Sequence, residues 1–184
     1  MPKKYESKSM ILEVCRNIVA SEGIGALNMR KVASQSGLAI GSLYYYFPSK
    51  NDLLIASIES VWEDIFKIDE IDLKAINLSD YIRLVYSNIK EGMEKYPNFL
   101  SIHSISFSSN KDEKAKSVMK KFLDSLKADI VEILENDKKV KTSVFDEDFT
   151  REDFADFVIA NIISLWLTRK SVDFLTKTIE KIIY

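Results

Sequence analysis

The chain has few of the residues that build disulfide frameworks, metal sites, tight turns or membrane spans. With one cysteine, Cys15, and one histidine, His103, in 184 residues, it can form no disulfide framework and no thiolate-only zinc site, and we expect no metal. Five glycines and three prolines supply too few turns for a many-stranded β fold. The N-terminus shows no apolar signal core, and the longest apolar run, residues 158–167, is about half of what a membrane span needs. We therefore expect a soluble, cytoplasmic protein without a membrane partner.

The residue sets that enzymes use are also missing. The sequence contains no glycine-rich phosphate loop, Cys15 lies in an apolar helical segment, and a single histidine offers no pair of nucleophile and base. We predict no catalytic residues, no enzymatic activity and no cofactor apart from a small-molecule effector.

The net charge of −2 is unevenly distributed. Residues 1–50 contain seven Lys or Arg and three Glu, a net charge of +4, so residues 51–184 carry −6. Because charge steers association, an anionic polymer would be attracted to the first 50 residues and repelled by the rest. This asymmetry is compatible with nucleic-acid binding, and equally with an ordinary basic N-terminus.

The spacing of apolar residues predicts an all-α protein with about nine helices. Ser49 with Asp52 and Thr150 with Asp153 form patterns typical of capping boxes at helix starts. Asn28 can cap a further helix. We expect helices over about residues 10–22, 29–36, 40–47, 49–66, 78–96, 97–107, 150–167 and 172–182. A further long helix is expected to follow a loop at residues 108–110, with an apolar stripe from Met119 to Leu134.

Residues 29–47 carry the most specific pattern. Ala33 is small where two helices must cross, and Gly37, four residues later, suits a turn with a positive φ. Leu43 lies six residues beyond Gly37 and is expected to point inward together with Phe47. This spacing is typical of a helix-turn-helix, whose second helix lies in the major groove of DNA.

The segment from Gly25 to Leu54 resembles the N-terminal domain of TetR-family transcriptional regulators. The resemblance rests on Val32-Ala33, Gly37, Gly41-Ser42-Leu43-Tyr44, Tyr46-Phe47 and Ser49-Lys50 through Leu53. It covers about residues 8–60, and the helical remainder resembles the family less specifically. It implies a homodimer that binds a double-stranded palindromic operator, usually as a repressor, and that releases DNA when a small-molecule inducer binds. It also implies a helix-turn-helix DNA-binding domain over residues 1–48 and a helical ligand-binding and dimerisation domain over residues 49–184.

Ten residues are predicted to contact DNA: Asn28, Lys31, Ala39, Ile40, Gly41, Ser42, Tyr44, Tyr45, Tyr46 and Lys50. Gly41 lets the backbone approach a base edge, and Ser42 can donate or accept a hydrogen bond there. Ile40, often polar in relatives, can contact only a thymine methyl group. Lys50, in the first turn of its helix, opposes the helix dipole unless a phosphate lies opposite. The alternative for Lys50 is a solvated side chain.

The three consecutive tyrosines span too wide an arc of one helix to face a single core. We therefore expect at least one phenol to reach a base or a phosphate. The alternative for Tyr44 or Tyr46 is packing inside the domain.

Residues 158–167 are apolar on nearly every side, so this helix needs cover on nearly every side. Together with the last helix it could form a four-helix interface between two copies. The alternative is a central helix buried in a monomer. The predicted dimer interface comprises Ile159, Ile163, Trp166, Val172, Leu175, Ile179 and Ile182.

The helices that line the ligand pocket in the resembling family supply the candidate ligand contacts. These are Phe99, His103, Phe107, Met119, Phe122 and Trp166. Residues 101–107 mix apolar and hydroxyl side chains without charge, which suits a semi-polar cavity and equally suits ordinary packing. Two other functions stay open: a helical scaffold whose helix-turn-helix no longer reads DNA, and a regulator that activates or that answers to a protein.

Overall fold

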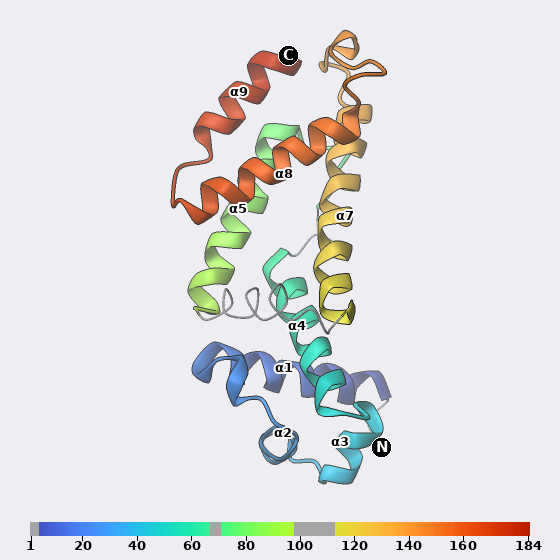
Figure 1. The fold of residues 1–184 in the computed structure, drawn as a ribbon, viewed down its shortest axis with the longest axis vertical. Coiled ribbons are helices and arrows are strands. Elements are labelled where there is room, and N and C mark those ends of the chain that lie inside the picture. Colours follow the sequence, from blue (N-terminus) through green and yellow to red (C-terminus); the bar gives the residue numbers. More distant parts are fainter. Residues whose placement is uncertain (1–3, 67–70, 98–112) are drawn as a thin grey trace. The chain divides into compact units, whose positions relative to one another are not determined.

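The structure, a computed structural model, describes residues 4–66, 71–97 and 113–184, and every regular element in these ranges is helical. This confirms the predicted all-α class. The elements of the described ranges are α1 (Lys4–Glu22), η1 (Ile24–Ala26), α2 (Met29–Gln35), α3 (Ile40–Tyr46), α4 (Lys50–Phe66), α5 (Leu78–Lys95), α7 (Glu113–Asn136), η3 (Thr142–Val144), α8 (Arg151–Leu167) and α9 (Asp173–Ile183) (Figure 1). The predicted helix over residues 97–107 lies almost entirely outside the described residues.

The observed helix boundaries follow local sequence signals where such signals exist. Ser49 accepts a hydrogen bond from the Asp52 backbone N–H at 3.1 Å, and Thr150 and Asp153 form a reciprocal capping box, as predicted. The long helix expected after residues 108–110 is α7, which starts at Glu113 and carries the predicted apolar stripe from Met119 to Leu134.

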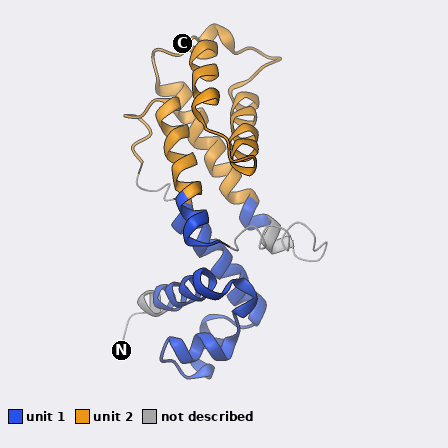
Figure 2. Ribbon diagram, turned by 90° about the vertical axis from the view of Figure 1, so that its left-hand side faces the viewer, with its two compact units in different colours: residues 1–65, 91–119 blue, residues 66–90, 120–184 orange. Residues whose placement is uncertain are grey.

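The chain divides into two compact units (Figure 2). Unit 1 comprises residues 1–65 and 91–119, and unit 2 comprises residues 66–90 and 120–184. Unit 1 therefore contains the helix-turn-helix together with almost all of α4. The predicted boundary at residue 48 separates a DNA-binding role from a ligand-binding and dimerisation role. The division into compact units does not test this boundary, which stays a prediction.

In unit 1, the apolar side of α1 supplies much of the core. Ile11, Cys15 and Ile18 are completely or almost completely buried at helical spacing, and Val32 of α2 and Leu43 of α3 are buried as well. Because burial disfavours a thiolate, it raises the pKa of the Cys15 thiol above its ordinary value. Cys15 is therefore a core residue of the unit that carries α2 and α3.

Unit 2 is a bundle of α5, α7, α8 and α9 that polar contacts tie together. The Tyr81 hydroxyl of α5 donates to the Asp129 carboxylate of α7 at 2.7 Å, and both side chains are buried. Arg83 of α5 donates to the Thr176 hydroxyl of α9 at 2.9 Å. A buried donor and acceptor that satisfy each other avoid the penalty of unpaired burial. Within the ranges that the structure describes, no helix is both long and apolar enough to cross a bilayer.

Candidate nucleic-acid interface

The turn between α2 and α3 has the geometry that its sequence predicts. Asn28 caps α2, since its side chain accepts from the Lys31 backbone N–H at 2.9 Å. At the other end, Gly37 has φ +65°. The Gly37 N–H donates to the Ser34 backbone carbonyl, and the Leu38 N–H donates to the Ala33 backbone carbonyl at 3.0 Å. This pair of bonds is a Schellman motif, which terminates α2 and redirects the chain into α3.

Two buried side chains hold α3 in place. Leu43 is fully buried and Phe47, its C-cap, is almost fully buried, which confirms the predicted inward orientation. Ala33, at the predicted close crossing, is buried too. Figure 1 shows α2 and α3 crossing next to each other within unit 1. With one side anchored, α3 presents a fixed opposite side to solvent.

The exposed surface of α3 contains most of the predicted base-contacting residues, and we call it the reading face. Its members are the exposed residues Ala39, Ile40, Gly41, Ser42, Tyr44 and Tyr45. Ile40 is 43% exposed and Tyr45 is 69% exposed. Tyr46 is half-buried and meets the Tyr45 ring edge-on at a centroid distance of 5.4 Å. Of the three tyrosines, Tyr44 and Tyr45 therefore offer the most accessible phenols.

Gly41 is not required by the fold. Its φ is not positive, and a Cβ built at this position would meet no atom within 4 Å. A glycine inside a helix lowers stability by about 0.5–1 kcal/mol relative to alanine. Gly41 thus lowers helix stability at a position where the chain's own packing would accept a side chain. A glycine here would allow an external surface to approach the backbone of α3.

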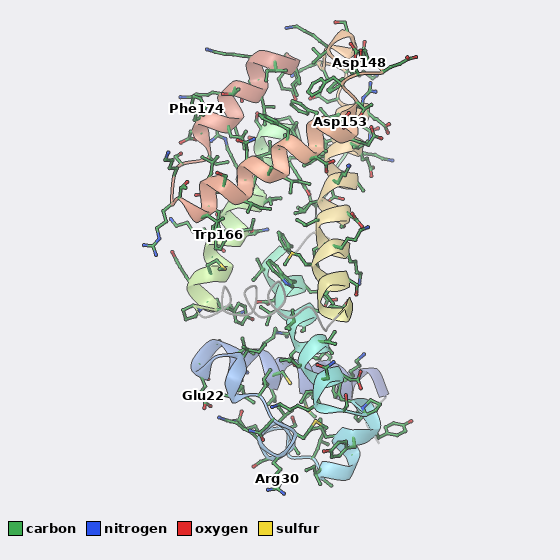
Figure 3. The ribbon with its side chains drawn as sticks, in the orientation of Figure 1. Glu22, Arg30, Asp148, Asp153, Trp166 and Phe174 are labelled. Carbon is green, nitrogen blue, oxygen red and sulfur yellow. The ribbon has the colours of Figure 1, made fainter. Side chains whose placement is uncertain are left out.

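The cations around α2 differ in availability. Lys31 forms an ion pair with Glu22 at the end of α1, so its charge is already partly compensated. Lys50 is exposed in the first turn of α4, as predicted. Arg30, which the sequence prediction omitted, is exposed next to Lys31 and projects away from α2 (Figure 3). The signal that could have identified Arg30 is its place in the first turn of α2, beside the predicted cap Asn28.

A polar cluster inside unit 1 connects α1, α4 and the end of α5. Arg16 of α1 donates to the Ser60 hydroxyl of α4, and Asp64 of α4 accepts from Lys95 at 2.6 Å and from Tyr96 at 2.8 Å. Partial burial works against the charged carboxylate, but the two hydrogen bonds and the nearby cations outweigh it and lower the pKa of Asp64. This cluster fixes the helix that follows the helix-turn-helix.

The predicted dimer interface needs correction at four positions. Ile159, Val172, Leu175 and Ile179 are buried in the core of their own chain and can supply little area to a partner. The reason is that an amphipathic helix such as α9 first buries its most apolar stripe against its own bundle. Of the remaining predicted positions, Ile163 and Ile182 are exposed and Trp166 is half-buried.

Several apolar side chains remain uncovered on these two helices, only one of them, Ile163, among the predicted positions, and we call this set the α8–α9 face. It consists of Phe157, Ile163 and Leu167 of α8 and Phe174 of α9, the last being 77% exposed. A groove of about 510 Å³ between the two helices is lined by Phe157 and Phe174 among others. Figure 3 labels Phe174 on α9.

The predicted ligand contacts are only partly described. Phe99, His103 and Phe107 lie outside the described residues. Phe122 is buried in unit 2, where its ring stacks on that of Phe66 at 5.7 Å, which makes it a core residue in this structure. Met119 of α7 and Trp166 of α8 are half-buried. In the part of the chain that the structure describes, no three His, Cys, Asp or Glu side chains gather as a metal site.

A helix-turn-helix with one anchored and one exposed side on its second helix defines a DNA-binding regulatory module. Residues 11–57 match the family model described as bacterial regulatory proteins, tetR family. Residues 11–57 are therefore a TetR-type N-terminal DNA-binding domain, which confirms the resemblance seen in this part of the sequence.

Relatives and solved structures agree with this assignment. The nucleoid occlusion factor SlmA of Actinobacillus pleuropneumoniae serotype 5b (strain L20) is 27% identical over 155 residues, which are 80% of this chain and 75% of that protein. The HTH-type transcriptional repressor KstR of Rhodococcus jostii (strain RHA1) is 30% identical over 92 residues, which are 50% of this chain and 43% of that protein. The transcriptional regulator FadR from Bacillus subtilis, solved in complex with stearoyl-CoA, shares the fold with a TM-score of 0.61 at 20% identity, over 88% of this chain and 86% of that one.

Proposed function

We propose that this protein is a ligand-responsive repressor that binds a palindromic operator as a homodimer and releases it when a small molecule binds. In this proposal, residues 1–48 bind DNA, and residues 49–184 bind the ligand and form the dimer. The observation that carries the DNA-binding part is the reading face, held on a short helix whose other side is fixed by Leu43 and Phe47.

The α8–α9 face supports the dimer. Phe157, Ile163, Leu167 and Phe174 remain exposed on two neighbouring helices, which is unfavourable for a chain that stays alone in water. A second copy could cover this face with the same face of its own, and its aromatic side chains could enter the groove between α8 and α9. Two recognition helices held about 34–36 Å apart would then fit successive major grooves.

The ligand-responsive part is supported by similarity. FadR has the same fold and binds stearoyl-CoA in its structure. A ligand that favours a dimer with a different separation of the two recognition helices would shift the population away from DNA. We propose Met119 and Trp166, with Phe99, His103 and Phe107, as candidate contacts.

Selection of binding sites from a random duplex library tests the DNA-binding part. We expect the purified protein to enrich an inverted repeat, with an affinity that falls steeply as salt increases because phosphate contacts release counterions. If a folded, ligand-free protein enriches no sequence, the proposal fails, and the helical scaffold with a non-reading helix-turn-helix takes its place.

A second candidate is a DNA-bound factor that acts without a small-molecule inducer. The observation in its favour is that the similarity to SlmA extends over 80% of this chain, whereas the similarity to KstR covers 50%. The two candidates differ in how the selected operator is released. Protein-free small-molecule extract, and stearoyl-CoA as a defined probe, should release DNA from a ligand-responsive repressor and should leave the second candidate bound.

A further inference from the structure

The reading face contains no side chain that makes paired hydrogen bonds to a purine. Its exposed side chains are those of Ala39, Ile40, Ser42, Tyr44 and Tyr45, so its polar groups are hydroxyls alone. Guanine is most often read by a guanidinium or ammonium group, and adenine by an amide, each with two hydrogen bonds. From α3 itself, neither of these contacts is available.

The packing of the chain does not explain why an isoleucine stands at position 40. Ile40 is 43% exposed at the first position of α3, whereas Leu43 on the same helix is fully buried and already anchors it. One helical turn further on, the exposed ring of Tyr44 extends the same side of the helix. The result is an exposed apolar ridge along α3, next to the side that Leu43 and Phe47 anchor.

The major groove offers one apolar group to such a ridge. Each of its base edges carries hydrogen-bonding atoms, but only thymine adds a methyl group, at C5. In a helix-turn-helix, the first residues of the second helix are those that reach the base edges. Gly41 adds no side chain beside Ile40, which leaves the isoleucine free to approach the base.

We infer that Ile40 determines operator specificity by packing against the 5-methyl group of one thymine in each half-site. This inference rests on the proposed function, since it requires that α3 enters the major groove. It adds to that function the base that the site selects, thymine, and the group through which this base is recognised, its 5-methyl group. Sequence readout from α3 then depends on apolar contact rather than on paired hydrogen bonds.

The test replaces thymine by deoxyuridine, which removes the methyl group and preserves base pairing. Each thymine of the selected operator is replaced in turn, in both half-sites together, and the affinity of wild-type protein is measured. One position should lose about fourfold per half-site, the value of one buried methyl group, and therefore about fifteenfold in the dimer complex. The other thymines should change affinity much less.

Three variants assign this loss to Ile40. Ile40→Ala should bind the thymine operator more weakly than wild type and should bind the thymine and deoxyuridine operators equally well. Ile40→Val keeps a branched apolar side chain and should retain part of the discrimination. Tyr45→Phe, on the same exposed face, should discriminate as wild type does. Thermal unfolding of each variant checks that the exposed substitutions leave the fold intact.

The possible results separate this inference from the proposed function. Discrimination by wild type that Ile40→Ala abolishes supports the inference. An enriched inverted repeat with no thymine sensitive to deoxyuridine, or equal discrimination by Ile40→Ala, overturns the inference and leaves the proposed function standing. If no repeat is enriched by folded protein, the proposed function fails, and the inference fails with it.

Discussion

The reading face of α3 and the α8–α9 face both expose apolar side chains, but they differ in size and in supporting chemistry. The reading face is a short surface in which Ile40 stands among a glycine, a serine and two phenols. The α8–α9 face exposes three large aliphatic or aromatic side chains on α8 and Phe174 on α9, beside a groove. A narrow face rich in hydroxyls suits a polar groove with one methyl group, whereas a broad apolar face suits another protein surface.

The difference shows that exposure alone does not identify a partner. Ile40 is 43% exposed and Ile163 is 39% exposed, yet their neighbours give them different expected contacts. Each experiment below changes a residue of one face, or a reference position. It then measures whether operator binding, oligomeric state or stability changes as the assigned contact predicts.

The largest effect is expected from charges on the α8–α9 face. Ile163→Glu combined with Phe174→Glu should yield monomers, because two buried carboxylates per subunit would face an apolar partner surface. Operator affinity should fall about a hundredfold or more, since the two half-sites are then bound independently. Sedimentation velocity measures the oligomeric state, and DNA titration measures the affinity.

Leu84→Glu is the matched control for this experiment. Leu84 is 38% exposed on α5, close to the value of Ile163, but lies on another helix of unit 2. We expect this variant to remain dimeric and to bind DNA normally. A dimer that survives the double substitution would refute the location of the interface.

The next effect separates DNA binding from stability at a single position of the reading face. Gly41→Ala should raise the free energy of unfolding by about 0.5–1 kcal/mol, because alanine favours the helix and a Cβ meets no atom here. The same variant should lose about tenfold in operator affinity, because the added methyl group occupies space next to a base edge. Denaturant unfolding and DNA titration measure the two quantities on one preparation.

Gly92→Ala provides the opposite case. A Cβ there would lie 2.5 Å from Cγ1 of Ile65, so overpacking should lower the free energy of unfolding by about 1–3 kcal/mol. If Gly41→Ala is stabilised and keeps full affinity, the duplex does not approach Gly41 closely.

A smaller effect is expected from the cations beside the reading face. Arg30→Ala and Lys50→Ala should each weaken binding a few-fold on every sequence and reduce the slope of affinity against salt by about 1. Lys31→Ala should change the slope less, because Glu22 already pairs with Lys31. Equal slopes for wild type and Arg30→Ala would remove Arg30 from the phosphate contacts.

The smallest effect comes from an interior reference that belongs to neither face. The lowered pKa of Asp64 means that its stabilising contribution is present above the unfolded pKa of about 3.9 and is lost as pH falls through the folded pKa. Asp64→Asn should therefore lower the free energy of unfolding at pH 7, by about 0.5 kcal/mol, because solvent screens the interactions of a partly exposed carboxylate. The difference from wild type should shrink below about pH 4. Urea unfolding at pH 3 to 7 measures it, and a pH-independent difference would contradict the assigned role.

Local chemistry is what the sequence could predict. The structure confirms the predicted turn at Gly37, the caps at Asn28 and Ser49, the capping box at Thr150, and the inward positions of Leu43 and Phe47. Each depends on residues close together along the chain, where spacing alone fixes the geometry. For the same reason the all-α class and the TetR-type N-terminal domain were recognisable from the sequence.

The tertiary structure decided which apolar side chains remain uncovered. The periodicity of the sequence identified the apolar stripe of Val172, Leu175 and Ile179, but it could not show which surface covers that stripe. In the fold, other residues of the same chain bury it, whereas Phe174 stays exposed. Likewise, the fold pairs Lys31 with Glu22 and leaves Arg30 exposed beside it. The physical reason is that burial and charge pairing depend on residues distant in sequence, and only their packing determines which surfaces remain for a partner.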